Sequence, residues 1–66
     1  MAKLITFDGD KGETVWINPG HATLVEQVEP GRAVVYFSGG NLSPVFLKGE
    51  AGQIAARLNQ HMGWWW

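Results

Sequence analysis

The chain has 66 residues, no cysteine, five basic and six acidic residues and a formal net charge of -1. The absence of cysteine excludes disulfides and thiolate zinc sites, and a domain of this size has a modest core, so self-association is the expected reinforcement. A hydrophobic fraction of 45% is typical of a globular protein, and the basic residues are too scattered to form a footprint for a phosphate backbone: Lys3, Lys11, Arg32, Lys48 and Arg57.

Strong turn signals divide most of the chain into short segments. They lie at residues 8–12, 18–20, 30–31 and 38–41, where Gly, Pro, Asn and Asp cluster. Five runs rich in β-branched and aromatic residues lie around them, at 4–7, 14–17, 22–28, 33–37 and 42–47. Short strands joined by short turns predict an antiparallel meander of four to five strands.

Alternation within two of these runs indicates which residues share a face of the sheet. In the third run it places Leu24 with Ala22 and opposite Val25, and in the fourth it places Val34 and Tyr36 together. Neither run is polar on one face, which predicts burial on both sides and a partner surface, expected to be another copy.

The last strand-like run contains Pro44. Proline lacks the amide donor that a central strand needs, so this strand is predicted to be an edge, at least near its start. Edge strands offer pairing to another chain.

The final third of the chain changes to a helical period. Residues 49–51 are expected to open a helix, and Gly63 is placed to end it. An apolar stripe is formed by Ala51, Ile54, Ala55, Leu58 and Met62. One helix packed on a small β-meander predicts an α+β fold, with residues 1–66 as a single domain.

Three consecutive tryptophans, Trp64, Trp65 and Trp66, follow the expected helix stop. Each indole buries roughly 200 Å² when it finds a site, and consecutive residues of an extended segment point to alternate sides. The tail is expected to dock on a neighbouring subunit or another protein, or to fold back over its own sheet edge. Membrane anchoring is less favoured because no basic cluster flanks the tail. No apolar run is long enough for a signal peptide or a membrane span, so a cytoplasmic location is expected.

The sequence contains only weak matches to motifs of metal sites or catalytic sites. Asp8, Asp10 and Gly12 resemble the start of a calcium loop, but Glu13 and Pro19 stand where that loop needs glycine and glutamate, so a hairpin turn and no metal site are predicted. His21 and His61 have no partnered nucleophile or ligand spacing. We therefore assign no catalytic residue and no cofactor. A cleft shared between subunits would direct attention to Tyr36, His21 and Glu26.

Several short segments carry a family resemblance. They are Lys3-Leu4-Ile5-Thr6 with its following turn, the stretch 15–19, Gly39-Gly40, Val45, Leu47-Lys48 and the helix over 54–58. Together they resemble the small flagellar-operon (FlbD/SwrD-like, swarming motility) family, whose members look like motility accessory proteins without catalytic residues. The chain departs from that pattern at Gly49-Glu50, at Pro44 and in the tryptophan tail.

These observations predict a non-catalytic, oligomeric binding or adaptor module rather than an enzyme. It is expected to assemble through its sheet face and tail, using Trp16, Val25, Val34, Tyr36, Trp64, Trp65 and Trp66. The alternative is a ring-like oligomer that binds nucleic acid or a small ligand between subunits. A homo-oligomer or a protein partner is expected, and nucleic acid is not.

Overall fold

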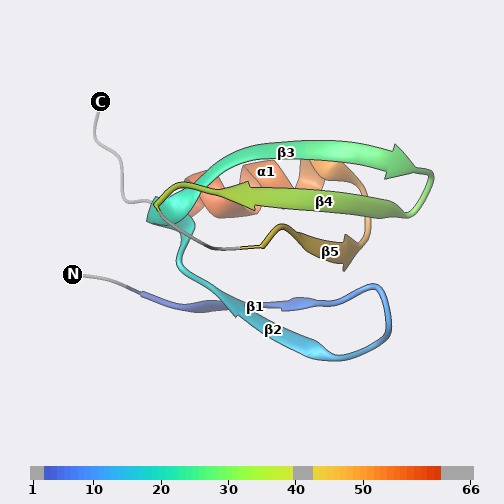
Figure 1. The fold of residues 1–66 in the computed structure, drawn as a ribbon, viewed down its shortest axis with the longest axis horizontal. Coiled ribbons are helices and arrows are strands. Elements are labelled where there is room, and N and C mark those ends of the chain that lie inside the picture. Colours follow the sequence, from blue (N-terminus) through green and yellow to red (C-terminus); the bar gives the residue numbers. More distant parts are fainter. Residues whose placement is uncertain (1–2, 40–42, 62–66) are drawn as a thin grey trace.

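Five antiparallel strands precede one helix in the computed structural model, which describes residues 3–39 and 43–61 (Figure 1). The elements are β1 (Ile5–Asp8), β2 (Thr14–Ile17), the short 3-10 helix η1 (Pro19–His21), β3 (Ala22–Glu29), β4 (Arg32–Phe37), β5 (Val45–Lys48) and α1 (Ala51–Gln60). This order confirms the predicted α+β fold and the antiparallel meander.

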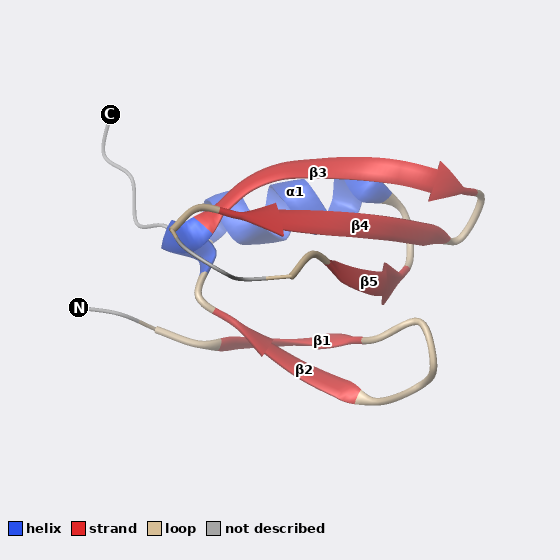
Figure 2. Ribbon diagram, in the orientation of Figure 1, coloured by secondary structure: helices blue, strands red, loops and turns tan. Residues whose placement is uncertain are grey.

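The strands form two sheets that lie against each other. β1 and β2 make a hairpin, and β3, β4 and β5 make a three-stranded sheet in that order. The two sheets meet where Gly9 bridges Leu47 and where the amide of Asp10 donates to the Phe46 carbonyl over 3.2 Å. Helix α1 lies behind the larger sheet and covers one of its faces (Figure 2). The opposite face of β3, β4 and β5 is left uncovered by the helix.

The core lies between the larger sheet, the β1–β2 hairpin and the helix. Its most deeply buried residues, Ala33, Val35 and Leu47, come from β4 and β5 and have no exposed surface. The remaining buried members come from the hairpin and the helix: Ile5, Phe7, Ile17, Ile54 and Leu58. Strand alternation explains which residues of β4 belong to the core, because Ala33 and Val35 point to the helix while Val34 and Tyr36 point away.

Helix α1 has the predicted apolar stripe. Ile54 and Leu58 are buried, and Ala51 and Ala55 are half-buried, whereas Gln53 and Arg57 are exposed. Met62 and Gly63, the expected end of the stripe and of the helix, lie outside the described residues. Burial of this stripe against the sheet supplies most of the reason for a ten-residue segment to be helical, since an isolated helix of this length is marginal in water.

Strand β3 contains two β-bulges that the sequence does not reveal. Ala22 pairs with Phe37 and Leu24 pairs with Tyr36, so Thr23 is an extra residue, and a second irregularity lies between Gln27 and Glu29. Because a bulge shifts alternation by one residue, Ala22 packs with Val25 against the core. The prediction that Ala22 shares a face with Leu24 was therefore wrong.

Strand β5 begins at Val45, directly after Pro44, and is an outer strand of the three-stranded sheet. This confirms the edge position predicted from the proline. The expected start at residue 42 was too early, since residues 43 and 44 precede the strand and residue 42 lies outside the described part.

Candidate functional site

The uncovered face of β3, β4 and β5, which we call the outer face, is mostly apolar, although the Glu26 carboxylate lies among its apolar residues. Leu24 lies opposite Tyr36, and Glu26, Val34 and Phe46 lie side by side across the three strands. Leu24, Tyr36 and Phe46 retain 50%, 39% and 37% of their surface, whereas Val34 is 2% exposed although it is not part of the main core. The exposed side chains thus surround a buried valine.

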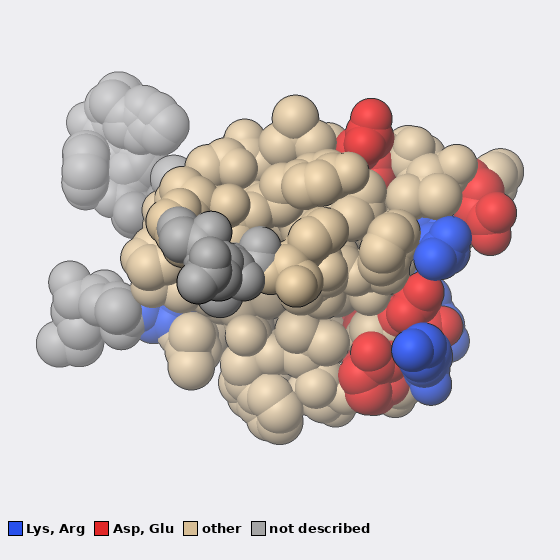
Figure 3. Space-filling model, viewed as in Figure 1, with Lys and Arg blue, Asp and Glu red and all other residues tan. Residues whose placement is uncertain are grey.

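Most of the charged side chains on this side of the molecule lie at one end. Figure 3 shows acidic and basic groups gathered at the end that carries the β1–β2 and β3–β4 turns, with a further acidic group at the upper edge and a basic group at the opposite end. The Arg32 guanidinium lies 3.0 Å from Asp10 Oδ2 and 4.5 Å above the Phe46 ring. Cross-strand register also brings Arg32 next to Glu29 and Lys48. Both signs are interleaved, which differs from the single-sign surface that phosphate backbones need.

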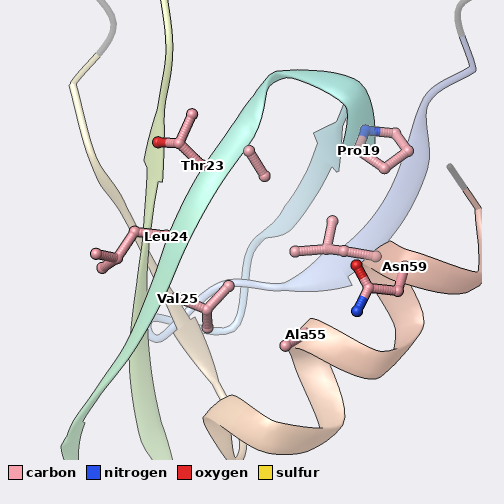
Figure 4. Close-up of a pocket in the computed structure, with 8 residues that line it drawn as sticks. Pro19, Thr23, Leu24, Val25, Ala55 and Asn59 are labelled. Atoms are coloured by element: carbon pink, nitrogen blue, oxygen red, sulfur yellow. The ribbon is translucent and has the colours of Figure 1, made fainter.

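A groove separates β3 from the helix on the other side of the sheet. This β3–α1 groove is open to solvent and has a volume of about 210 Å³. It is lined by Pro19, Ala22, Thr23, Leu24, Val25, Ala55, Leu58 and Asn59. Figure 4 shows Val25 on the helix side of β3, facing Ala55, while the Leu24 side chain lies on the other side of the strand. Pro19 and Asn59 lie toward the same end of the groove, on opposite sides of it (Figure 4). Its lining carries no charged side chain.

Trp16 lies on the β1–β2 hairpin. Its strand neighbours Val15 and Ile17 pack into the core, but the Trp16 side chain is 61% exposed. It borders a hollow of about 230 Å³ together with His21, Phe37 and Val45. Trp16 thus presents an aromatic surface from the smaller sheet.

The structure separates the interface candidates that the sequence grouped together. Tyr36 is exposed on the outer face and Val34 is buried beneath its neighbours there, whereas Val25 faces the helix and lines the β3–α1 groove. Trp16 belongs to the other sheet, and Trp64, Trp65 and Trp66 lie outside the described residues. Leu24 and Phe46, the other exposed apolar residues of the outer face, were missed. Strand alternation was the sequence signal for them, because it sets Leu24 on the opposite side of its strand from Val25 and Phe46 on the opposite side from Leu47.

Of the residues weighed for chemistry, two lie on one face of the larger sheet and the third lies in η1. Glu26 and Tyr36 share the outer face on adjacent strands, and His21 lies in η1, where its carbonyl accepts the Ser38 amide over 2.9 Å. The loop at residues 8–13 is a hairpin turn in which the Gly9 amide donates to the Glu13 carbonyl over 2.7 Å. Within residues 3–39 and 43–61, no three His, Cys, Asp or Glu side chains cluster as a metal site would require.

Comparison with family models, curated proteins and solved structures found no match to this chain. In the part of the chain that the structure describes, no helix has the length and apolarity needed to cross a membrane.

Proposed function

We propose that this chain is a non-catalytic binding module that associates with a second copy of itself through the outer face. The observation that supports this proposal is the exposure of Leu24, Tyr36 and Phe46 on one sheet face around the buried Val34. Adjacent exposed apolar residues with a charged border are the pattern of a protein interface, with a desolvated centre and a polar rim.

The size of the molecule fits an interface on this side. A stable interface buries about 800 Å² on each partner, roughly a fifth of the 4510 Å² surface of this chain. The molecule measures 31 × 25 × 18 Å, and the outer face lies on the 31 × 25 Å side seen in Figure 1. This broad side can supply the area, whereas the edges of the molecule are narrower.

The charged end of the outer face favours a second copy over a strongly charged partner. Asp10, Glu29, Arg32 and Lys48 lie there with both signs represented. Two copies related by a two-fold axis can set acidic groups of one chain against basic groups of the other, because the same patch is used by both.

The proposal is tested by light scattering on the full chain and on Tyr36→Lys, across protein concentrations of roughly 10–500 µM. The matched control is Gln53→Lys, which adds the same charge on the exposed side of α1. We expect the unsubstituted chain and Gln53→Lys to form the same defined oligomer and Tyr36→Lys to have the monomer mass. A monomeric unsubstituted chain, or an oligomer that Tyr36→Lys leaves intact, would refute the proposal.

A further inference from the structure

We infer that the tryptophan tail docks in cis, with one indole of residues 64–66 seated in the β3–α1 groove of its own chain. Apolar side chains lie on both walls of the groove, with Pro19, Ala22 and Val25 on one side and Ala55 and Leu58 on the other, and Thr23 and Asn59 add polar groups to the lining. The groove and the outer face lie on opposite sides of β3 and share one residue, Leu24, and the inference does not rest on the outer face.

The volume of the groove matches one aromatic side chain. A cavity of about 150 Å³ holds a benzene ring, so the 210 Å³ of the β3–α1 groove suits one indole and is too small for three. Because consecutive residues of an extended segment alternate in direction, only one or two of the three tryptophans can face the same wall. The uncharged lining of the groove also matches an uncharged aromatic segment.

The chain leaves the helix beside this groove. Leu58 and Asn59, in the last turn of α1, line it, and the His61 amide donates to the Leu58 carbonyl over 3.2 Å. Trp64 follows His61 by three residues, a contour of at most about 11 Å. The end of the groove that Asn59 lines is therefore close to His61, the last described residue before the tail.

Two further features favour the tail of the same chain. A link of a few residues gives an effective concentration in the millimolar range, so docking in cis outcompetes the tail of another molecule at ordinary protein concentrations. The Asn59 side chain points toward the groove in Figure 4, and its amide oxygen is an acceptor for the indole N–H, which buried tryptophans need.

The test uses a Trp16→Phe chain, in which the three tail indoles are the only tryptophans. Acrylamide quenching is measured on this chain, on the same chain with Ala55→Phe, which fills the groove, and with Ala56→Phe, which adds the same ring on the exposed side of α1. We expect a protected fraction of the emission that Ala55→Phe abolishes, that Ala56→Phe preserves, and that does not change on dilution.

Three outcomes would overturn the inference. They are full quenching of the starting chain, protection that Ala55→Phe leaves unchanged, and protection that is lost on dilution, which would assign the groove to the tail of another copy. A measurement on the unsubstituted chain guards against misfolding of Ala55→Phe. There, nuclear Overhauser contacts are expected between a tail indole and the Val25 methyl groups, and their absence would also overturn the inference.

Discussion

Gln27 joins three parts of the fold, and its replacement should destabilise the domain more than its exposed position suggests. Its side-chain oxygen accepts the amide of Ala51, the first residue of α1, over 2.7 Å. Its side-chain nitrogen donates to the carbonyls of Glu29 and Arg32 over 2.7 and 3.2 Å. A strand residue thus caps the helix and closes the β3–β4 turn.

The expected loss follows from these three hydrogen bonds. Removing a helix N-terminal cap costs about 1 kcal/mol, and the two solvent-accessible bonds to carbonyls contribute about 0.5 kcal/mol each because water can replace the donor. Gln27→Ala should therefore lower the free energy of unfolding by about 2 kcal/mol, or the melting temperature by roughly 8–16 °C in a domain of this size.

Urea unfolding followed by circular dichroism, at one low protein concentration for all variants, measures this loss. Gln27→Met, which keeps the length of the side chain without its polar atoms, should be as destabilised as Gln27→Ala. The control is Gln53→Ala on the exposed side of α1, which should change stability by less than about 0.5 kcal/mol. The reasoning is refuted if Gln27→Ala behaves like the control, or if Gln27→Met retains the stability of the unsubstituted chain.

Substitutions at four further positions have defined outcomes in the same unfolding assay. Leu47→Ala removes a side chain with no exposed surface and should cost about 2–5 kcal/mol, enough to leave the chain largely unfolded; a cooperative transition near that of the unsubstituted chain would contradict this. Gly31→Ala should cost about 1 kcal/mol, because the φ of +81° is strained for alanine although no atom obstructs its Cβ. Gly52→Ala, in the helix, should instead stabilise by about 0.5 kcal/mol, and equal effects at the two glycines would contradict the account. Arg57→Ala should cost about 1 kcal/mol, since the guanidinium donates to the Thr6 carbonyl over 2.6 Å and lies 4.6 Å above the Phe7 ring; Arg57→Lys should recover only part of this, and full recovery would count against the planar contact.

Features that depend on neighbouring residues were predictable from the sequence. The turn after β2 is an example, because the Asn18 side chain accepts the Gly20 amide over 3.0 Å, a bond between residues two apart. The helical stripe of Ile54 and Leu58 and the alternation of Val34 with Val35 in β4 are similarly local. These patterns follow from the 3.6-residue and two-residue periods of helix and strand.

Features that depend on distant pairing were not predictable. The bulge at Thr23 follows from how β3 aligns with β4, and it moves Ala22 to the core face against simple alternation. Gln27 caps a helix that begins 24 residues later. The Glu50 carboxylate, next to the start of α1, accepts the Gly31 amide of the β3–β4 turn over 2.7 Å. No local pattern specifies such partners.

The candidate site shows the same division between local features, which were predictable, and distant pairing, which was not. The shared face of Val34 and Tyr36 follows from alternation within one strand, and the structure has both on the outer face. The neighbours that complete the patch, Leu24 and Phe46, depend on the registers of β3 and β5 against β4. Val25 was grouped with Tyr36 as an interface candidate, but it lies on the opposite side of the sheet, in the β3–α1 groove.

The most direct test of self-association through the outer face is a search for contacts between copies in an equal mixture of isotope-labelled and unlabelled chain. Isotope-filtered nuclear Overhauser spectra of the unsubstituted protein report only protons that belong to different molecules. We predict intermolecular contacts from the Tyr36 and Phe46 rings and from the Leu24 methyl groups. Intermolecular contacts confined to other surfaces, or none at concentrations where the chain is oligomeric, would contradict the account.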